Sequence, residues 1–189
     1  DNGFSVSSNV VSKQNASQTG FLTDQAATNW STQVAYTTDS YHVSLISAVK
    51  SNGWTDSYYT TTLGKARPDG NSTNYGLRAY WRPDDSDAAV PEISAGYDIS
   101  TVAGQDADTD AFFVGLTWKD AFQADDKIGI ALGQPQTADT DTVDPFAWEA
   151  YYSFKLNDSV TMTPAIFGSN DRTGGGLEDV TGYVLQTTF

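Results

Sequence analysis

The chain has no cysteine among its 189 residues, which excludes a disulfide framework and a metal site built on thiolates. Basic residues are few, with 10 lysines and arginines against 24 aspartates and glutamates and a net charge of −14. This balance excludes nucleic acid as a partner, because a phosphate backbone needs a basic surface. The one histidine, His42, cannot form a His-rich metal site. No run of about 18 apolar residues is present, so the sequence predicts no membrane-spanning helix.

Alternation between apolar and polar residues recurs along the whole chain, in segments bounded by turn residues. A period of two residues is typical of β-strands with two different faces. The sequence therefore predicts an all-β chain with about ten strands and no helix, in one domain over residues 1–189. The expected strands are Phe4–Ser12, Trp30–Thr38, Tyr41–Lys50, Asn74–Arg82, Glu92–Ser100, Ala111–Lys119, Lys127–Gln134, Ala147–Leu156, Val160–Phe167 and Val180–Phe189.

The connections between the expected strands alternate in length. The short and intermediate ones are residues 38–40, 83–91, 120–126 and 157–159. The longer and more polar ones are residues 13–29, 51–73, 101–110, 135–146 and 168–179. Short turns at one end of the strands and long loops at the other are typical of an outer-membrane β-barrel.

One face of the expected strands is apolar, and the other mixes small, polar and charged residues. In the strand 147–156, Trp148 and Tyr152 share the apolar face, whereas Glu149 and Lys155 lie on the other. Aromatic residues lie near both ends of the apolar face with aliphatic residues between them, which matches the two interfacial belts of a membrane protein. The residues assigned to these aromatic girdles are Trp30, Tyr75, Trp81, Trp118, Trp148, Phe154 and Phe189.

The last residue, Phe189, closes an alternating strand, and this ending is typical of outer-membrane barrels. A soluble β-sandwich also alternates, but its tryptophans would lie centrally in the buried core. The expected fold class is therefore an antiparallel transmembrane β-barrel.

Several segments carry a family likeness: Asn74–Pro83, Ile93–Tyr97, Trp118–Phe122, Lys127–Pro135, Phe146–Phe154, Asn157–Phe167 and Leu185–Phe189. They resemble cyanobacterial outer-membrane porins of the carbohydrate-porin-like family, which carry an S-layer-homology domain ahead of the barrel. The resemblance implies a barrel of roughly sixteen strands, of which this chain is the C-terminal portion. It also implies the cell outer membrane, contact with lipid bilayer and lipopolysaccharide, a homotrimer, and passive diffusion of ions, carbohydrates or other small hydrophilic solutes. Wall anchoring is not carried over, because its domain is not in this sequence.

Charged residues on the polar face are the candidate pore-lining residues. Several cations fall at the turn ends of strands and would form a basic arc that favours anions, because charged rings on a pore wall set ion selectivity. The alternative is that these charges pair across strands or cap turns, and keep the lumen wet and in register. The candidate residues are Arg78, Arg82, Glu92, Asp98, Lys119, Glu149 and Lys155.

Acidic loops at residues 106–110 and 139–141 could bind Ca²⁺ or Mg²⁺ at the surface, but the sequence favours ordinary solvated loops. No other cofactor and no catalytic residue is expected. The pairs Asp84-Asp85 and Asp125-Asp126 could be read as glycosidase carboxylates, but they lie in turns without an aromatic cleft. Residues 174–176 are glycine-rich, but they lack the lysine of a phosphate-binding loop.

Two other functions remain open from the sequence. A soluble all-β carbohydrate-binding module would show a Trp-rich groove and would need no detergent. An outer-membrane hydrolase would have to use His42, because a Ser-His-Asp triad needs a histidine.

Overall fold

The structure is a computed structural model that describes residues 3–13, 23, 26–52, 54, 71–83, 89–102, 108–138, 145–170 and 179–189. Its elements are β1 (Gly3–Lys13), β2 (Ala27–Thr37), β3 (Tyr41–Ser51), β4 (Ser72–Trp81), β5 (Glu92–Val102), β6 (Thr109–Lys119), β7 (Lys127–Ala138), β8 (Phe146–Asn157), β9 (Val160–Asn170) and β10 (Val180–Thr188). Within these ranges, no helix is long and apolar enough to cross a membrane.

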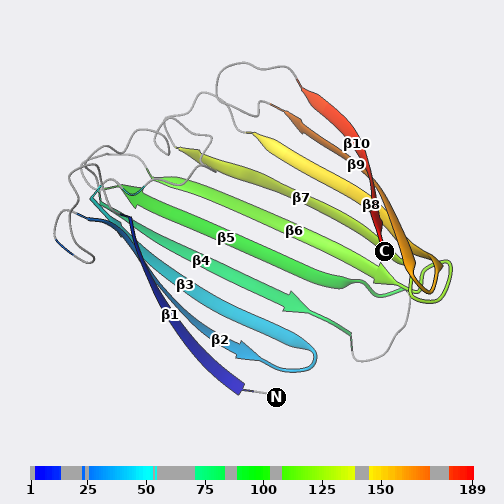
Figure 1. The fold of residues 1–189 in the computed structure, drawn as a ribbon, viewed down its shortest axis with the longest axis horizontal. Coiled ribbons are helices and arrows are strands. Elements are labelled where there is room, and N and C mark those ends of the chain that lie inside the picture. The colour runs from blue at the N-terminus through cyan, green and yellow to red at the C-terminus, as the bar shows by residue number, and fades with distance from the viewer. Residues whose placement is uncertain are drawn as a thin grey trace.

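All ten strands form one antiparallel sheet in chain order, from β1 at one edge to β10 at the other (Figure 1). Each strand is 9 to 12 residues long. That length matches the roughly 9–11 residues with which a tilted strand crosses a bilayer. The all-β prediction and all ten expected strands are confirmed.

The observed strand ends differ from the expected ones by a few residues, most clearly in β7. This strand runs through Pro135 to Ala138, although the sequence predicted that it ends at Gln134. Between Asp110 and Phe112 the register of β6 against β7 shifts, so one residue of β6 faces two residues of β7. A proline lacks the N–H that a ladder needs, and a bulge of this kind accommodates it inside a strand.

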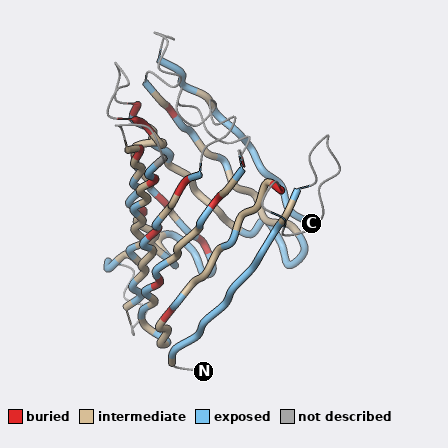
Figure 2. The backbone as a smooth tube through the Cα atoms, turned by 90° about the vertical axis from the view of Figure 1, so that its left-hand side faces the viewer, coloured by how far each residue is buried: buried red, intermediate tan, exposed pale blue. Residues whose placement is uncertain are grey.

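Direct register partners lie on the same face of an antiparallel sheet, so the pairing defines two continuous faces. One row runs from Val34 through Leu45, Leu77 and Tyr97 to Phe112 across β2 to β6. The side chains of this face are largely apolar and exposed. Figure 2 shows that buried residues occur only at scattered points along the strands. The opposite face is polar and more crowded, with buried small residues such as Ser44, and we call it the concave face; the apolar one is the convex face.

The described residues contain almost no apolar core. The buried hydrophobic side chains among them are Ala26, Ala35, Trp54 and Ala138. Leucine, isoleucine, valine and aromatic side chains instead lie exposed in large numbers on the convex face. Apolar burial between layers therefore does not hold these strands together, and the hydrogen-bond ladder has that role.

The two edge strands do not pair with each other, so the sheet is open. Apolar side chains lie exposed on both edges, including Val6 on β1 and Tyr183 on β10, which is 90% exposed. A long, unpaired apolar edge is a site for pairing with a further strand. This geometry is compatible with a larger barrel.

Large rings on one strand repeatedly lie over a glycine of a neighbouring strand. Phe113 covers Gly96, and Phe167 covers Gly182; in each case the ring and the glycine are direct register partners. The same arrangement joins Tyr151 to Gly129 on the concave face and Trp148 to Gly168 on the convex face. The glycine leaves room for the ring, and the ring shields the backbone that the glycine exposes.

Substitution of Gly129 tests this packing, because a β-carbon there would overlap the Tyr151 ring. We expect Gly129→Val to lower the free energy of unfolding by about 1–3 kcal/mol, the usual effect of overpacking. Urea unfolding of the protein in detergent, followed by tryptophan fluorescence, measures the change. Ala131→Val is the matched control, because Ala131 lies on the same face of the same strand. An equal loss in the two variants would contradict the role of the ring.

Candidate functional site on the concave face

A three-residue ion cluster lies at the turn end of the concave face. Glu92 begins β5, and its Oε1 atom lies 3.3 Å from Nε of Arg82 and 2.5 Å from Nζ of Lys119. These residues come from three consecutive strands, and the antiparallel register brings them to one level. Both cations stay half exposed. The cluster is therefore accessible to solvent, and salt screens its charges.

Aromatic stacking extends this level toward β2. The Tyr80 ring stacks on the His42 ring with centroids 5.3 Å apart and planes at 7°, and the Arg82 guanidinium lies 4.5 Å from the Tyr80 ring. Nδ1 of His42 shares a 2.8 Å hydrogen bond with Oγ1 of Thr37. His42 thus lines the concave face and contacts a tyrosine and a threonine.

On the other side the level continues to β7 and β8. Nζ of Lys155 lies 2.7 Å from Oδ2 of Asp125, a residue of the turn before β7. Lys127 pairs directly with Lys119 across β6 and β7. The sequence analysis did not select Lys127, although its alternation with Gly129 places it on the same face.

We call this level the basic tier: it comprises the cations Arg82, Lys119, Lys127 and Lys155 with the carboxylates Glu92 and Asp125. These six residues sum to +2, and Asp120 and Asp158 in the adjoining turns add two carboxylates at the same end of the strands, with Asp158 close enough to act on Lys155. Three of the cations that the sequence analysis selected thus lie together here, each in an ion pair. Arg78 does not belong to this group, since it lies deeper on the face.

Arg78 pairs with Asp98 at the next level, with 2.6 Å between Nη2 and Oδ2. The guanidinium carbon also lies 5.7 Å from the Phe113 ring. Glu149 lies on the same face, opposite Phe167 of β9. Asp98 is six residues from Glu92 along β5, which is about 20 Å at the usual strand rise. One positive and two negative charges give this second level, the acidic tier, a net charge of −1.

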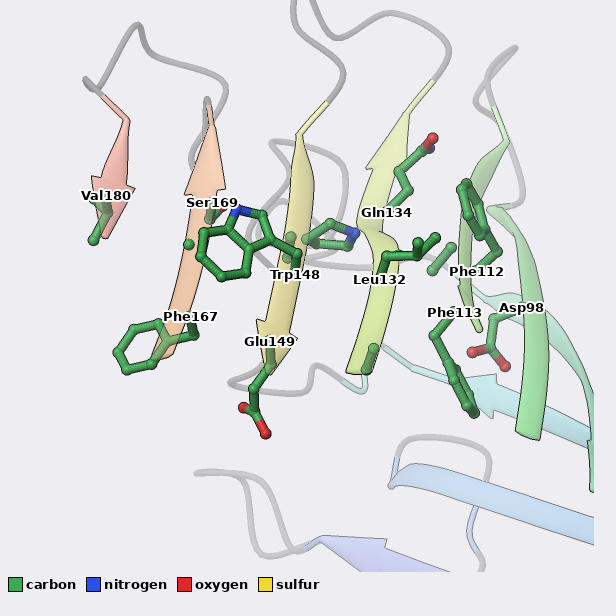
Figure 3. A pocket seen from close by; sticks show the side chains of 16 residues that line it. Asp98, Phe112, Phe113, Leu132, Gln134, Trp148, Glu149, Phe167, Ser169 and Val180 are labelled. Carbon is green, nitrogen blue, oxygen red and sulfur yellow. The ribbon is translucent and has the colours of Figure 1, made fainter. Parts of the chain in front are cut away.

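A cavity of about 590 Å³ opens on the acidic tier between β5 and β10 (Figure 3). Asp98, Phe113, Glu149 and Phe167 extend to the same side of the sheet in this view. The floor between the two phenylalanines consists of small residues of β7 and β8. The cavity was not predicted from the sequence, because it depends on which strands are neighbours.

The aromatic residues assigned to the girdles lie on the convex face in a regular pattern. On each of β2, β4, β6 and β8, two aromatic residues lie six positions apart, which is about 20 Å along the strand. The pairs are Trp30 with Tyr36, Tyr75 with Trp81, Phe112 with Trp118 and Trp148 with Phe154. Phe189, directly after β10, is 92% exposed.

The turn over residues 120–126 is built around a buried carboxylate that the sequence analysis discounted. Asp126 is 0% exposed. Its carboxylate accepts hydrogen bonds from the backbone N–H groups of Ala121 (2.7 Å), Phe122 (3.0 Å) and Gln123 (3.0 Å), and from the Tyr152 hydroxyl (2.9 Å). Burial raises the pKa of Asp126, but these hydrogen bonds outweigh it and hold the pKa below the usual carboxyl range.

The same turn positions an aromatic cluster at the end of the convex face, in which Phe122 is exposed. Phe122 packs edge-on against Tyr152 at 5.7 Å, and Tyr152 stacks with Phe154 at 5.2 Å between ring centroids. Asp120 and Asp125 both have positive φ, at 53° and 64°, a conformation that aspartate tolerates better than most residues. The turn therefore has a defined conformation, and the bond from Tyr152 to Asp126 holds the start of β7 against β8.

Most of the acidic loop residues proposed as cation ligands, Asp106, Asp139 and Asp141, lie outside the described residues. The same holds for Asp84, Asp85 and residues 174–176. In the described part of the chain, no group of three or more histidine, aspartate or glutamate side chains is placed to hold a metal ion.

Comparison with known proteins gives a likeness in fold. No protein-family model matches the sequence, and no curated protein matches it. Among solved structures, the chain is similar to in-vitro folded OmpT, an outer membrane protein of Vibrio cholerae, in its trimer form, with a TM-score of 0.54 and 13% identity. The match covers 96% of this chain and 62% of that chain, so this chain spans about three fifths of its length. The chain therefore has the all-β architecture of an outer-membrane β-barrel protein, in a sheet that is open here.

Substitution of Asp126 tests whether its buried carboxylate stabilises the turn over residues 120–126. The folded-state pKa of Asp126 is below its unfolded value, so its contribution to stability is present above the ordinary carboxyl range and is lost as pH falls through the folded pKa. We expect Asp126→Asn to lower the urea midpoint at pH 7 and to flatten the loss of stability below about pH 4. Asp125→Asn, which removes only an exposed ion pair, should change both much less. Equal effects of the two variants would refute the assignment.

Proposed function

We propose that this chain forms the C-terminal portion of an outer-membrane porin, whose water-filled channel lets ions and small hydrophilic solutes diffuse passively. The observation that carries the proposal is the distribution of polarity over the two faces of the sheet, which is the inverse of that in a soluble protein. The exposed convex face is apolar, and the charged residues line the concave face. This distribution suits a barrel with lipid outside and water inside.

The exposed surface argues against the rival carbohydrate-binding module. The chain exposes 11849 Å². A compact soluble monomer of this length exposes roughly 8,800 Å². Such a module would also place its tryptophans in a groove, whereas Trp30, Trp81, Trp118 and Trp148 lie on the convex face at both ends of an aliphatic band. A bilayer gives that arrangement a favourable environment, which supports the porin.

The proposal needs more strands than the ten described. A closed channel requires partners for β1 and β10, and a ten-stranded barrel alone would enclose a narrow, largely filled lumen. A barrel of about sixteen strands, as the resemblance to cyanobacterial porins implies, would be wide enough for solutes. Assembly as a trimer, contact with lipopolysaccharide and a place in the cell outer membrane belong to the same proposal.

The basic tier supports a preference for anions at the mouth with the short turns. Its net charge of +2 is spread over the concave faces of β4 to β8, and its cations remain half exposed. Charges on a pore wall act on permeant ions through the local potential. Arg78, Asp98 and Glu149 would line the wall further along the same path. Carbohydrates remain candidate permeants, and bound Ca²⁺ or Mg²⁺ in the acidic loops remains a proposal.

Conductance in a planar bilayer tests the channel. We expect protein extracted in detergent to insert and to produce discrete current steps in KCl. A comparison of solubility with and without detergent separates the rival function, because the carbohydrate-binding module should stay monomeric in plain buffer. Good solubility without detergent, combined with no current steps, would refute the porin.

Charge variants of the basic tier test selectivity. Lys119→Gln combined with Lys155→Gln should lower the ratio of anion to cation permeability by about twofold, because the local potential at the mouth falls. Glu92→Gln should raise the ratio, since it leaves Arg82 and Lys119 without their carboxylate. The zero-current potential in a KCl gradient measures both shifts. Lys13→Gln, which removes one charge at the opposite end of the sheet, serves as the control and should leave the ratio unchanged.

A further inference from the structure

Two large, exposed phenylalanines lie on the concave face. Phe113 on β6 is 38% exposed and Phe167 on β9 is 37% exposed. The first covers a glycine of β5 and the second a glycine of β10, so the two rings lean away from each other. Between them lies a floor of Ala131, Gly133 and Ala147, which belong to β7 and β8. Two strands separate these rings, so the floor spans about 14 Å.

At one wall of the cavity, the protein combines a carboxylate, an aromatic ring and a cation. Asp98 binds the Arg78 guanidinium at 2.6 Å, and the same guanidinium lies 5.7 Å from the Phe113 ring. A cation near an aromatic face is attracted by the ring quadrupole, and the carboxylate adds an opposite charge. At this wall the protein's own guanidinium occupies the place beside the carboxylate and the ring.

At the other wall, the protein supplies the carboxylate and the ring alone. Glu149 and Phe167 are direct register partners on β8 and β9. In the part of the chain that the structure describes, no cation is in contact with Glu149; Arg78, Arg82, Lys119 and Lys155 pair with other carboxylates. The basic-tier cations nearest to Glu149 are Lys127, which pairs with Ser153 four residues away along β8, and Lys155, six residues away. These separations, about 13 and 20 Å, both exceed the Debye length of about 8 Å at physiological salt.

We propose that Glu149 and Phe167 bind the ammonium group of a small organic cation whose apolar part lies on the Ala131, Gly133 and Ala147 floor. The cavity of about 590 Å³ has the size of a small-molecule site and is lined mainly by apolar atoms. A small anion would meet Glu149 with the wrong sign, and a bare metal ion would gain nothing from the apolar floor. The site goes beyond the proposed channel, because binding needs only the concave face and no transport.

Isothermal titration calorimetry on the full chain in detergent tests the site, with phenethylammonium as the probe. Phenylacetate and 2-phenylethanol have the same ring with a negative charge or with none. We expect the ammonium compound to bind more tightly than either, and Glu149→Gln to weaken it about fivefold at low salt. Phe167→Leu should weaken it about threefold, since it removes the ring and keeps an apolar side chain. β-Sheet circular dichroism of each variant monitors folding.

Asp158→Asn is the matched control, since it removes one exposed carboxylate at the far end of the sheet. It should leave the affinity unchanged. Equal binding of the three probes, or an affinity that neither Glu149→Gln nor Phe167→Leu changes, would overturn the site. Those results leave the channel proposal intact, whereas a failure of bilayer conductance with probe binding retained would remove the channel and keep the site.

Discussion

The antiparallel hydrogen-bond ladder is the interaction on which the rest of this structure depends. The described residues form almost no apolar core, and each strand contacts mainly the strands next to it in sequence. Backbone hydrogen bonds to water compete with such a ladder, whereas a bilayer offers no competing donor or acceptor. A single layer with an apolar exposed face is therefore reasonable in lipid and unfavourable in water. The edges β1 and β10 are where the ladder is incomplete.

The concave face carries charged side chains together with large rings that protrude little from the sheet. Phe113, Tyr151 and Phe167 each lie over a glycine of the neighbouring strand, where no side chain pushes the ring away from the sheet. The charged residues that we assigned to the basic tier and the acidic tier are separated by four residues along β4 and by six along β5 and β8, which is about 13 to 20 Å. At physiological salt this separation exceeds the Debye length, so salt largely screens the two levels from each other.

Much of the fold could be predicted from local pattern. Alternation located all ten strands, the aromatic spacing placed Trp81 and Trp118 on the apolar face, and connection lengths indicated the two ends of the sheet. The extension of β7 through Pro135 was missed, because a proline reads as a strand end unless the bulge opposite it is known. Asp126 was missed as well. Its role depends on the Tyr152 hydroxyl, which lies 26 residues away in sequence.

The sequence by itself determined which residues share a face, because side-chain direction alternates with a period of two whatever the partner strand is. It also determined that the concave face would carry the charges. Only the tertiary structure decided which charges meet, because the register joins residues far apart in the chain, such as Glu92 and Lys119, 27 positions apart. The same register set Glu149 opposite Phe167 and left an open cavity between two phenylalanines, since a cavity depends on how neighbouring strands align and on where their side chains lean.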